Sequence, residues 1–208
     1  SVVFSSWTDA GRRWTEVSRD GGQTWSEPRA MKDVISLVHG TIVPGESAPS
    51  VAKSIPVADD NRVFLVQFET QSLSAWRQQL AGLGAEVLSW VPYDAHLVRM
   101  DPDLVASVEA LPFVRWVGAY EPAYRTFPGL LDGLDRSNVL AKRYNVMTYV
   151  AGADEKAQLA AEINALGGRI VTANAEGYIL EADLSDAQVM ALLASNRVRW
   201  IDEWSAPE

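Results

Sequence analysis

A four-residue block occurs twice in this chain and constrains the fold more than any other feature. Residues 114–117 read Val-Arg-Trp-Val and residues 198–201 read Val-Arg-Trp-Ile, each behind an amphipathic run. Two further pairs of segments match between the copies, namely 83–87 with 166–170 and 62–68 with 143–149. A unit of roughly 65 residues that occurs twice indicates a duplicated small domain.

The composition excludes several classes of protein. Apolar residues make up 48% and charged residues 22% of the 208 residues, which is typical of a globular chain of one or two domains. The formal net charge of −9 argues against a nucleic-acid partner, because such affinity comes mostly from clustered Lys and Arg. No run approaches the roughly 18 apolar residues of a membrane span. There is no cysteine, which removes disulfides and thiol nucleophiles and leaves the compartment open.

Turn-rich stretches divide the chain into five parts. We expect a β-hairpin arm at 1–38, a Pro- and Gly-containing linker at 39–61 and the first repeat at 62–125. A second linker at 126–142, with one or two helical turns after Pro128, leads into the second repeat at 143–208. The chain begins with Ser1 and carries no signal-peptide pattern, so we expect an excised or processed piece.

The first repeat alternates strands and helices. A β-branched strand at 63–68 precedes an apolar helical stripe that Gly84 can terminate. Two apolar strands at 86–91 and 95–100 are joined by a turn. Asp101 then caps a second helix with Pro102 at its first position, and 114–117 forms the fourth strand. The predicted order is βαββαβ.

The second repeat follows the same order with different residues. A strand at 144–150 precedes a helical stripe that Gly167 and Gly168 stop, and 169–173 with 177–182 form the hairpin. Ser185 and Gln188 form a capping box before the last helix. The fold class is therefore predicted as α+β, with two tandem ferredoxin-like βαββαβ sandwiches, each an antiparallel sheet with both helices on one face. The other face of each sheet is expected to be uncovered.

Small domains of this size are marginal alone, so partners are expected. Aromatic residues gather at the fourth strand of each copy and beyond it. They are Trp116, Tyr120 and Tyr124 in the first copy and Trp200 and Trp204 in the second. Such residues pack between copies or form an intermolecular interface. Both interpretations stay open.

The end of the second repeat resembles the last strand and tail of subtilisin propeptides of the inhibitor I9 type. An apolar alternating strand, 198–201, runs into the acidic pair Asp202 and Glu203 and then an extended tail, 204–208. The resemblance spans both repeats and is closest to the tandem prodomains of large bacterial subtilisin-like serine peptidases. It implies a non-catalytic propeptide that inhibits, and helps to fold, the peptidase domain of the same precursor. It also implies a secreted or cell-envelope location.

The resemblance assigns roles to residues of the second repeat. Trp200 and Ile201 would lie in the sheet interface with the peptidase, and Asp202 and Glu203 would cap two of its surface helices. The tail, Trp204, Ser205, Ala206, Pro207 and Glu208, would occupy the substrate cleft like a product, with Glu208 at P1. The first repeat has Gly118 and Ala119 in place of the acidic pair, so the inhibitory role is expected of the second.

Residues near the start match the Asp-box of sialidase-like β-propellers. Ser18, Asp20, Gly22 and Trp25 fit Ser-x-Asp-x-Gly-x-x-Trp, a turn device in which the carboxylate bonds the turn backbone. One box is too little for a propeller. A structural hairpin and, as a minor alternative, a glycan-binding site are both consistent with the motif.

The sequence offers no catalytic constellation. His39 lies in a predicted linker, and His96 lies in a predicted strand where the second copy has Tyr178. Neither pairs with a nucleophile in a recognisable pattern, and no metal-ligand cluster or cofactor motif occurs. We therefore expect no enzyme activity, no metal and no cofactor. The alternative to an inhibitory propeptide is a non-inhibitory tandem ferredoxin-like module that binds a protein or a small ligand.

Overall fold

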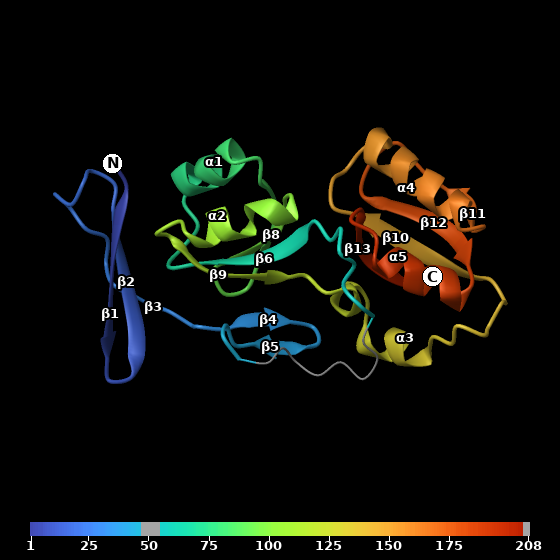
Figure 1. Ribbon diagram of the computed structural model, residues 1–208, viewed down its shortest axis with the longest axis horizontal. Coiled ribbons are helices and arrows are strands. Elements are labelled where there is room, and N and C mark those ends of the chain that lie inside the picture. Colours follow the sequence, from blue (N-terminus) through green and yellow to red (C-terminus); the bar gives the residue numbers. More distant parts are fainter. Residues whose placement is uncertain (47–54, 206–208) are drawn as a thin grey trace. The chain divides into compact units, whose positions relative to one another are not determined.

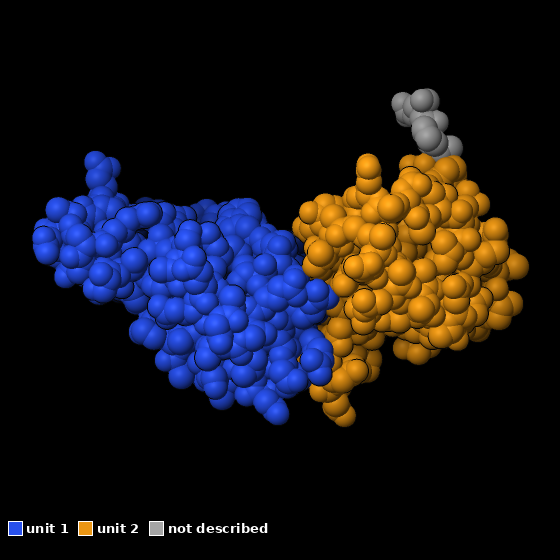
Figure 2. Space-filling view, turned by 90° about the horizontal axis from the view of Figure 1, so that it is seen from above, with its two compact units in different colours: residues 1–49, 62–120 blue, residues 50–61, 121–208 orange. Residues whose placement is uncertain are grey.

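The chain is of the α+β class and divides into two compact units. The computed structural model describes residues 1–46 and 55–205. One compact unit takes residues 1–49 and 62–120, and the other takes 50–61 and 121–208 (Figure 2). Each unit contains a four-stranded antiparallel sheet with helices. Residues 55–61 therefore belong to the same unit as the second repeat, and Ile55 is buried in the core of that unit.

The N-terminal residues form a three-stranded sheet that packs on the rest of the first unit. Its strands are β1 (Val3–Asp9), β2 (Arg12–Ser18) and β3 (Arg29–Ala30), and a tight turn with positive φ at Ala10 and Gly11 joins the first two. Arg13 Nε donates to Asp33 Oδ1 at 2.7 Å, and its Nη1 donates to the backbone oxygen of Glu69. Buried Thr15 bonds to Thr70 at 2.8 Å. The predicted arm is thus tied to the first repeat by polar contacts.

The first repeat builds a sheet in the order β7-β8-β6-β9. Its elements are β6 (Val63–Phe68), α1 (Ser74–Gly82), β7 (Glu86–Val91), β8 (Ala95–Arg99), η1 (Pro102–Leu104), α2 (Val105–Glu109) and β9 (Val114–Ala119). Gly84, with a φ of 91°, follows α1 as predicted. The Asp101 side chain caps η1 by accepting from the Asp103 backbone N–H, with Pro102 next in the chain.

Aromatic rings fill the core beneath the helices of the first repeat. Trp76 of α1 stacks on Phe113, with ring centroids 5.1 Å apart, and Phe113 stacks on Phe68 of β6. Phe4 of the N-terminal sheet meets the same Trp76 edge-on at 5.7 Å. The N-terminal sheet therefore contributes to the core of the first unit.

A second hairpin lies on the side of this sheet opposite α1 and α2 (Figure 1). It consists of β4 (Ile35–Leu37) and β5 (Gly40–Ile42), so a strand forms at the start of the range predicted as linker. Gln67 Nε2 donates to the Val34 carbonyl at 3.0 Å, and the Ser36 N–H donates to the Pro92 carbonyl. All six residues of β6 are buried, so both faces of this central strand are filled.

The second repeat has the same strand order by position in the chain, β11-β12-β10-β13. In the second unit, η2 (Pro122–Arg125) and α3 (Pro128–Gly133) precede this repeat. The elements of the repeat are β10 (Lys142–Thr148), α4 (Ala153–Ala165), β11 (Arg169–Thr172), β12 (Ile179–Leu184), α5 (Asp186–Leu193) and β13 (Val198–Glu203). The predicted capping box is confirmed, because Ser185 and Gln188 exchange both side chain to backbone hydrogen bonds. The helical turns predicted after Pro128 are confirmed as α3.

One hydrophobic cluster joins both helices of the second repeat to one face of its sheet. Alternate residues of β10 and β12, such as Val146 and Leu180, lie in this cluster with Leu159 and Ile163 of α4 and with Val189 of α5. Leu131 of α3, Leu134 and Ile55 extend the same cluster. The opposite face of the sheet carries the intervening residues and is called the open face below.

Strand pairing corrects two details of the repeat alignment. Val66 pairs with Val117, and Val146 pairs with Ile201, so Val63 rather than Arg62 corresponds to Arg143. His96 pairs with Val66 just as Leu180 pairs with Val146, so the counterpart of His96 is Leu180 and not Tyr178. A shift of one residue moves a side chain to the other face of a strand. In the hairpin of the second repeat, the second strand is accordingly displaced from its predicted range of 177–182, because β12 spans Ile179–Leu184.

Candidate interaction face of the second repeat

The open face of the second sheet carries two of the predicted site residues, Trp200 and Asp202. On β10, β12 and β13 it is formed by every second residue, and these are Arg143, Asn145, Met147, Ile179, Glu181, Asp183, Trp200 and Asp202. Cross-strand partners point to the same side of a sheet, which places Trp200 beside Met147 and Asp202 beside Asn145. The apolar half of the face consists of Met147, Ile179 and Trp200, and the charged half lies around Arg143 and Asp183.

Phe127 completes the apolar half from outside the sheet. Thr126 makes a parallel bridge to Ile201, and its Oγ1 donates to the Ile201 carbonyl at 2.7 Å. This pairing sets the next residue, Phe127, edge-on against the Trp200 ring at a centroid distance of 4.8 Å. Phe127 stays 51% exposed and Ile179 45% exposed. Sequence reasoning missed Phe127 because it lies in a predicted linker, and a lone aromatic before a proline gives no sign of strand pairing.

Of the two residues predicted for the sheet interface, only Trp200 lies on the open face. Ile201 is fully buried and points toward the helices, where it joins the core cluster with Val146. The reason is the two-residue period of a strand, which turns neighbours to opposite faces. Ile201 therefore holds the sheet on its helices while Trp200 is available for contact.

The same alternation separates the acidic pair. Asp202 lies on the open face, and its partial burial raises the pKa of the carboxyl while a hydrogen bond from Asn145 opposes the rise. Glu203 pairs with Tyr144 on the other side and approaches Lys142, with 4.0 Å between Nζ and Oε1. Burial, followed by nearby Asp186 and Glu203, raises the pKa of Tyr144 to about 12. A single flat partner surface can thus meet Asp202 but not both carboxylates.

The predicted tail begins in a fixed position. Trp204 extends the pairing of β13 with β10 by one residue, since its N–H donates to the Arg143 carbonyl at 3.1 Å. Ser205 is exposed. The remaining predicted tail residues, Ala206, Pro207 and Glu208, lie outside the described residues.

The Asp-box residues form a closed turn in the first unit. The Asp20 carboxylate accepts from the Ser18 hydroxyl and from the backbone N–H groups of Gln23 and Thr24, and the Ser18 hydroxyl accepts from the Gly22 N–H. These bonds, led by that of the Thr24 hydroxyl, lower the pKa of Asp20. Trp25 stays 42% exposed beside the turn. The polar groups of the box are used by the turn itself.

The two histidines lie in different parts of the first unit. His96 is buried in β8 with its ring edge-on to Phe68, and His39 lies in the turn between β4 and β5. In the described part of the chain, no three acidic or histidine side chains gather closely enough to hold a metal ion. No helix within residues 1–46 and 55–205 has the length and apolar character needed to cross a bilayer.

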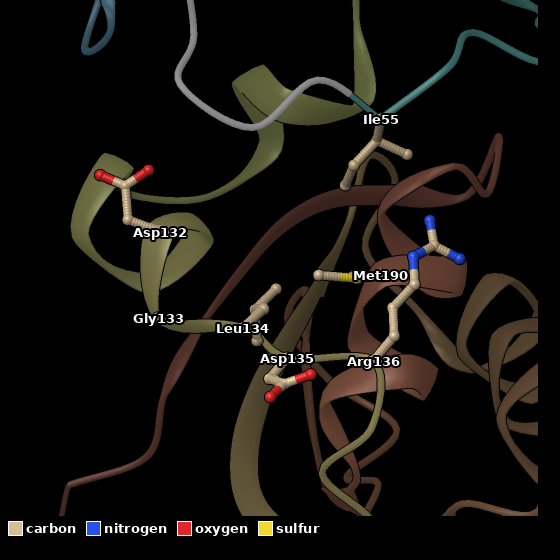
Figure 3. Close-up of a pocket in the computed structure, with 7 residues that line it drawn as sticks. All are labelled: Ile55, Asp132, Gly133, Leu134, Asp135, Arg136 and Met190. Carbon is tan, nitrogen blue, oxygen red and sulfur yellow. The ribbon is translucent and has the colours of Figure 1, made fainter.

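A cavity of about 530 Å³ lies beside α3 and α5 in the second unit. Figure 3 shows Ile55, Leu134 and Met190 pointing into it, while the Asp132 carboxylate points away. Asp135, also in the lining, accepts hydrogen bonds from the N–H and the hydroxyl of Ser137. The lining of the cavity thus combines apolar and charged side chains.

Comparison with protein families gives a match to part of the chain. Residues 36–121 match a family model described as a domain of unknown function (DUF8729). This range takes in β5 and all four strands of the first sheet. No curated protein and no solved structure matches the chain.

Proposed function

We propose that this chain is an inhibitory prodomain of a subtilisin-like serine peptidase, and that its second repeat carries the inhibitory contact. The strand orders β7-β8-β6-β9 and β11-β12-β10-β13 support interpreting each repeat as a ferredoxin-like βαββαβ sandwich. Fold alone is weak evidence for function, because many activities occur on this one. The surface of the second repeat is the stronger support.

The observation that carries the proposal is the difference between the two sheets. In the first, β6 is buried at every residue and a hairpin lies against the face away from the helices. In the second, that face presents Trp200, Phe127 and Ile179, the last two about half exposed. Exposed apolar side chains grouped on one face are typical of a protein interface.

The direction of β13 links this face to the substrate cleft. Trp200, Asp202 and Trp204 lie on the same side of one strand, and the tail follows directly. A peptidase that binds the open face would therefore receive the tail next to the contact. The partly desolvated Asp202 carboxylate would gain from the positive end of a helix in the partner, by about 0.3–1 kcal/mol at an exposed site. In this proposal the chain itself is not catalytic.

Inhibition of a purified subtilisin-like peptidase tests the proposal. The whole chain is mixed with the active enzyme, and hydrolysis of a peptide substrate is followed with time. We expect inhibition at micromolar or lower chain, lost largely in Trp200→Ala and in a chain ending at Glu203. Trp90→Ala is the matched control, since Trp90 is a 62% exposed tryptophan of the first repeat. Undiminished hydrolysis at micromolar excess of chain would contradict the proposal.

The cavity beside α3 and α5 supports a second candidate, a non-inhibitory module that binds a small ligand. Its volume of about 530 Å³ falls within the range of small-molecule sites. A thermal shift of the whole chain with a panel of small ligands, absent in Leu134→Trp, would favour this candidate. If Leu134→Trp still inhibits the peptidase, inhibition does not depend on the ligand-binding cavity.

A further inference from the structure

One row of side chains crosses the charged half of the open face from strand to strand. Arg169 of β11 stands opposite Asp183 of β12, and Asp183 stands opposite Arg143 of β10. Arg143 Nε donates to Asp183 Oδ1 at 3.2 Å, and Arg169 Nη2 donates to Oδ2 of the same carboxylate. The Asp183 side chain is only 17% exposed. One shielded carboxylate thus holds two guanidinium groups in line.

The row ends on Trp204, the first residue of the predicted tail. The guanidinium carbon of Arg143 lies 5.3 Å from the centroid of the Trp204 ring, within the range of a cation–π contact. The backbone of the same two residues is joined by the bond from the Trp204 N–H to the Arg143 carbonyl, at 3.1 Å. Trp204 is therefore fixed through both its backbone and its ring.

The first repeat has the same row with different chemistry. Glu86 and Arg99 form an ion pair at 2.9 Å, but buried Val63 stands where the second repeat has Arg143. Tyr120 donates its N–H to the Val63 carbonyl and is itself buried. The backbone arrangement is shared, whereas the stacked cation is specific to the second repeat. The scaffold alone therefore does not require it.

We propose that Arg143 is a positioning residue for the inhibitory tail. Held by Asp183 and Arg169, it fixes the ring of Trp204 and with it the direction in which the chain leaves the sheet. The inference rests on the proposed inhibitory function, and Arg143 acts through Trp204 without needing to touch the peptidase. A tail that leaves the sheet in one direction loses less conformational entropy when it enters a cleft, which strengthens binding.

The test compares whole-chain variants against a subtilisin-like peptidase. The variants are Arg143→Met, which keeps the length and removes the charge, Asp183→Asn, and the matched control Arg99→Met, which breaks the ion pair of the first repeat. For each we measure the inhibition constant at low and high salt, the melting temperature, and the rate at which the peptidase cuts the tail, by mass spectrometry. Wild-type inhibition is expected to weaken with salt, because the row is ionic and partly exposed.

Arg143→Met is expected to raise the inhibition constant about tenfold, to lose most of the salt dependence and to have its tail cut faster, with little change in melting temperature. Asp183→Asn is expected to change the same three quantities in the same direction, and Arg99→Met none of them. If Arg143→Met lowers the melting temperature, the inhibition constant of Asp183→Asn decides whether Arg143 has the positioning role. Wild-type inhibition with both variants equal to it would overturn the positioning role and leave the proposed function standing. A wild-type chain that does not inhibit would overturn both.

Discussion

The ring of Trp116 lies over Gly118 in the fourth strand of the first repeat. A Cβ atom placed on Gly118 would come within 2.2 Å of Cη2 of that ring. In the second repeat the corresponding residues are Trp200 and Asp202, and the tryptophan packs against Phe127 instead. The first repeat thus has Gly118 at the position of Asp202, and this glycine leaves the space that the Trp116 ring occupies. The two copies of one sequence block have acquired different faces.

Replacing Gly118 by Ala should therefore displace Trp116. We expect a loss of about 1 kcal/mol in the unfolding free energy of the first unit, because the ring must rotate away from the strand. Trp116 should also become more exposed, with a red shift in its emission. Gly133→Ala is the control, since a Cβ there meets nothing within 4 Å. Equal stabilities of the two variants would contradict the packing described.

Ile55 should stabilise the second unit although it precedes the first sheet in the chain. It is 7% exposed in the core cluster formed by α3, α4 and α5. We expect Ile55→Ala to cost about 2–3 kcal/mol, because a buried side chain leaves a cavity. Hydrogen exchange should speed up in β10 and β12 but not in β6. Val57→Ala, at a residue that is 38% exposed, should change little. Faster exchange in β6 alone would show that Ile55 belongs to the other unit.

Acid should weaken the first unit through His96. Burial, together with the charge of Arg77, lowers the pKa of His96 from 6.5, and Asp94 acts in the opposite direction. The unfolded chain then takes up a proton before the folded one does, so the unfolding free energy falls as pH drops below about 6.5. His96→Leu introduces the residue type that the second repeat has at this position. It should remove the contribution of His96 to the slope of unfolding free energy against pH. Urea unfolding between pH 5 and 8 measures it, and identical slopes would exclude His96 as the cause.

Lys156 should hold the loop between β11 and β12. Its ammonium group is buried and donates to the carbonyl of Asn174, at 2.6 Å, and to that of Glu176. We expect Lys156→Met to reduce the unfolding free energy of the second unit by about 1–2 kcal/mol, since these bonds carry a charged donor. Amide exchange at residues 173–177 should accelerate. Lys142→Met, at a side chain that is 55% exposed, is the control, and a larger loss there would contradict the role of Lys156.

The sequence alone determined the elements and the duplication. Helix ends and turns depend on a few adjacent residues, so the Ser185–Gln188 capping box, the Asp101 cap and the glycine after α1 were predicted from local chemistry. The antiparallel α+β class follows from the same local patterns. Trp200 and Asp202 were likewise predicted as site residues from their place at the end of the second copy.

Only the tertiary structure decided which face each residue occupies and which segments complete each unit. Alignment of the copies matched Arg62 with Arg143, and strand pairing moves that match to Val63. Ile201 lies in the core, Phe127 from the predicted linker contacts Trp200, and Ile55 lies in the core of the second unit. These outcomes depend on contacts between residues far apart in the chain. A two-residue strand period makes a shift of one residue exchange core and surface, and no local pattern specifies it.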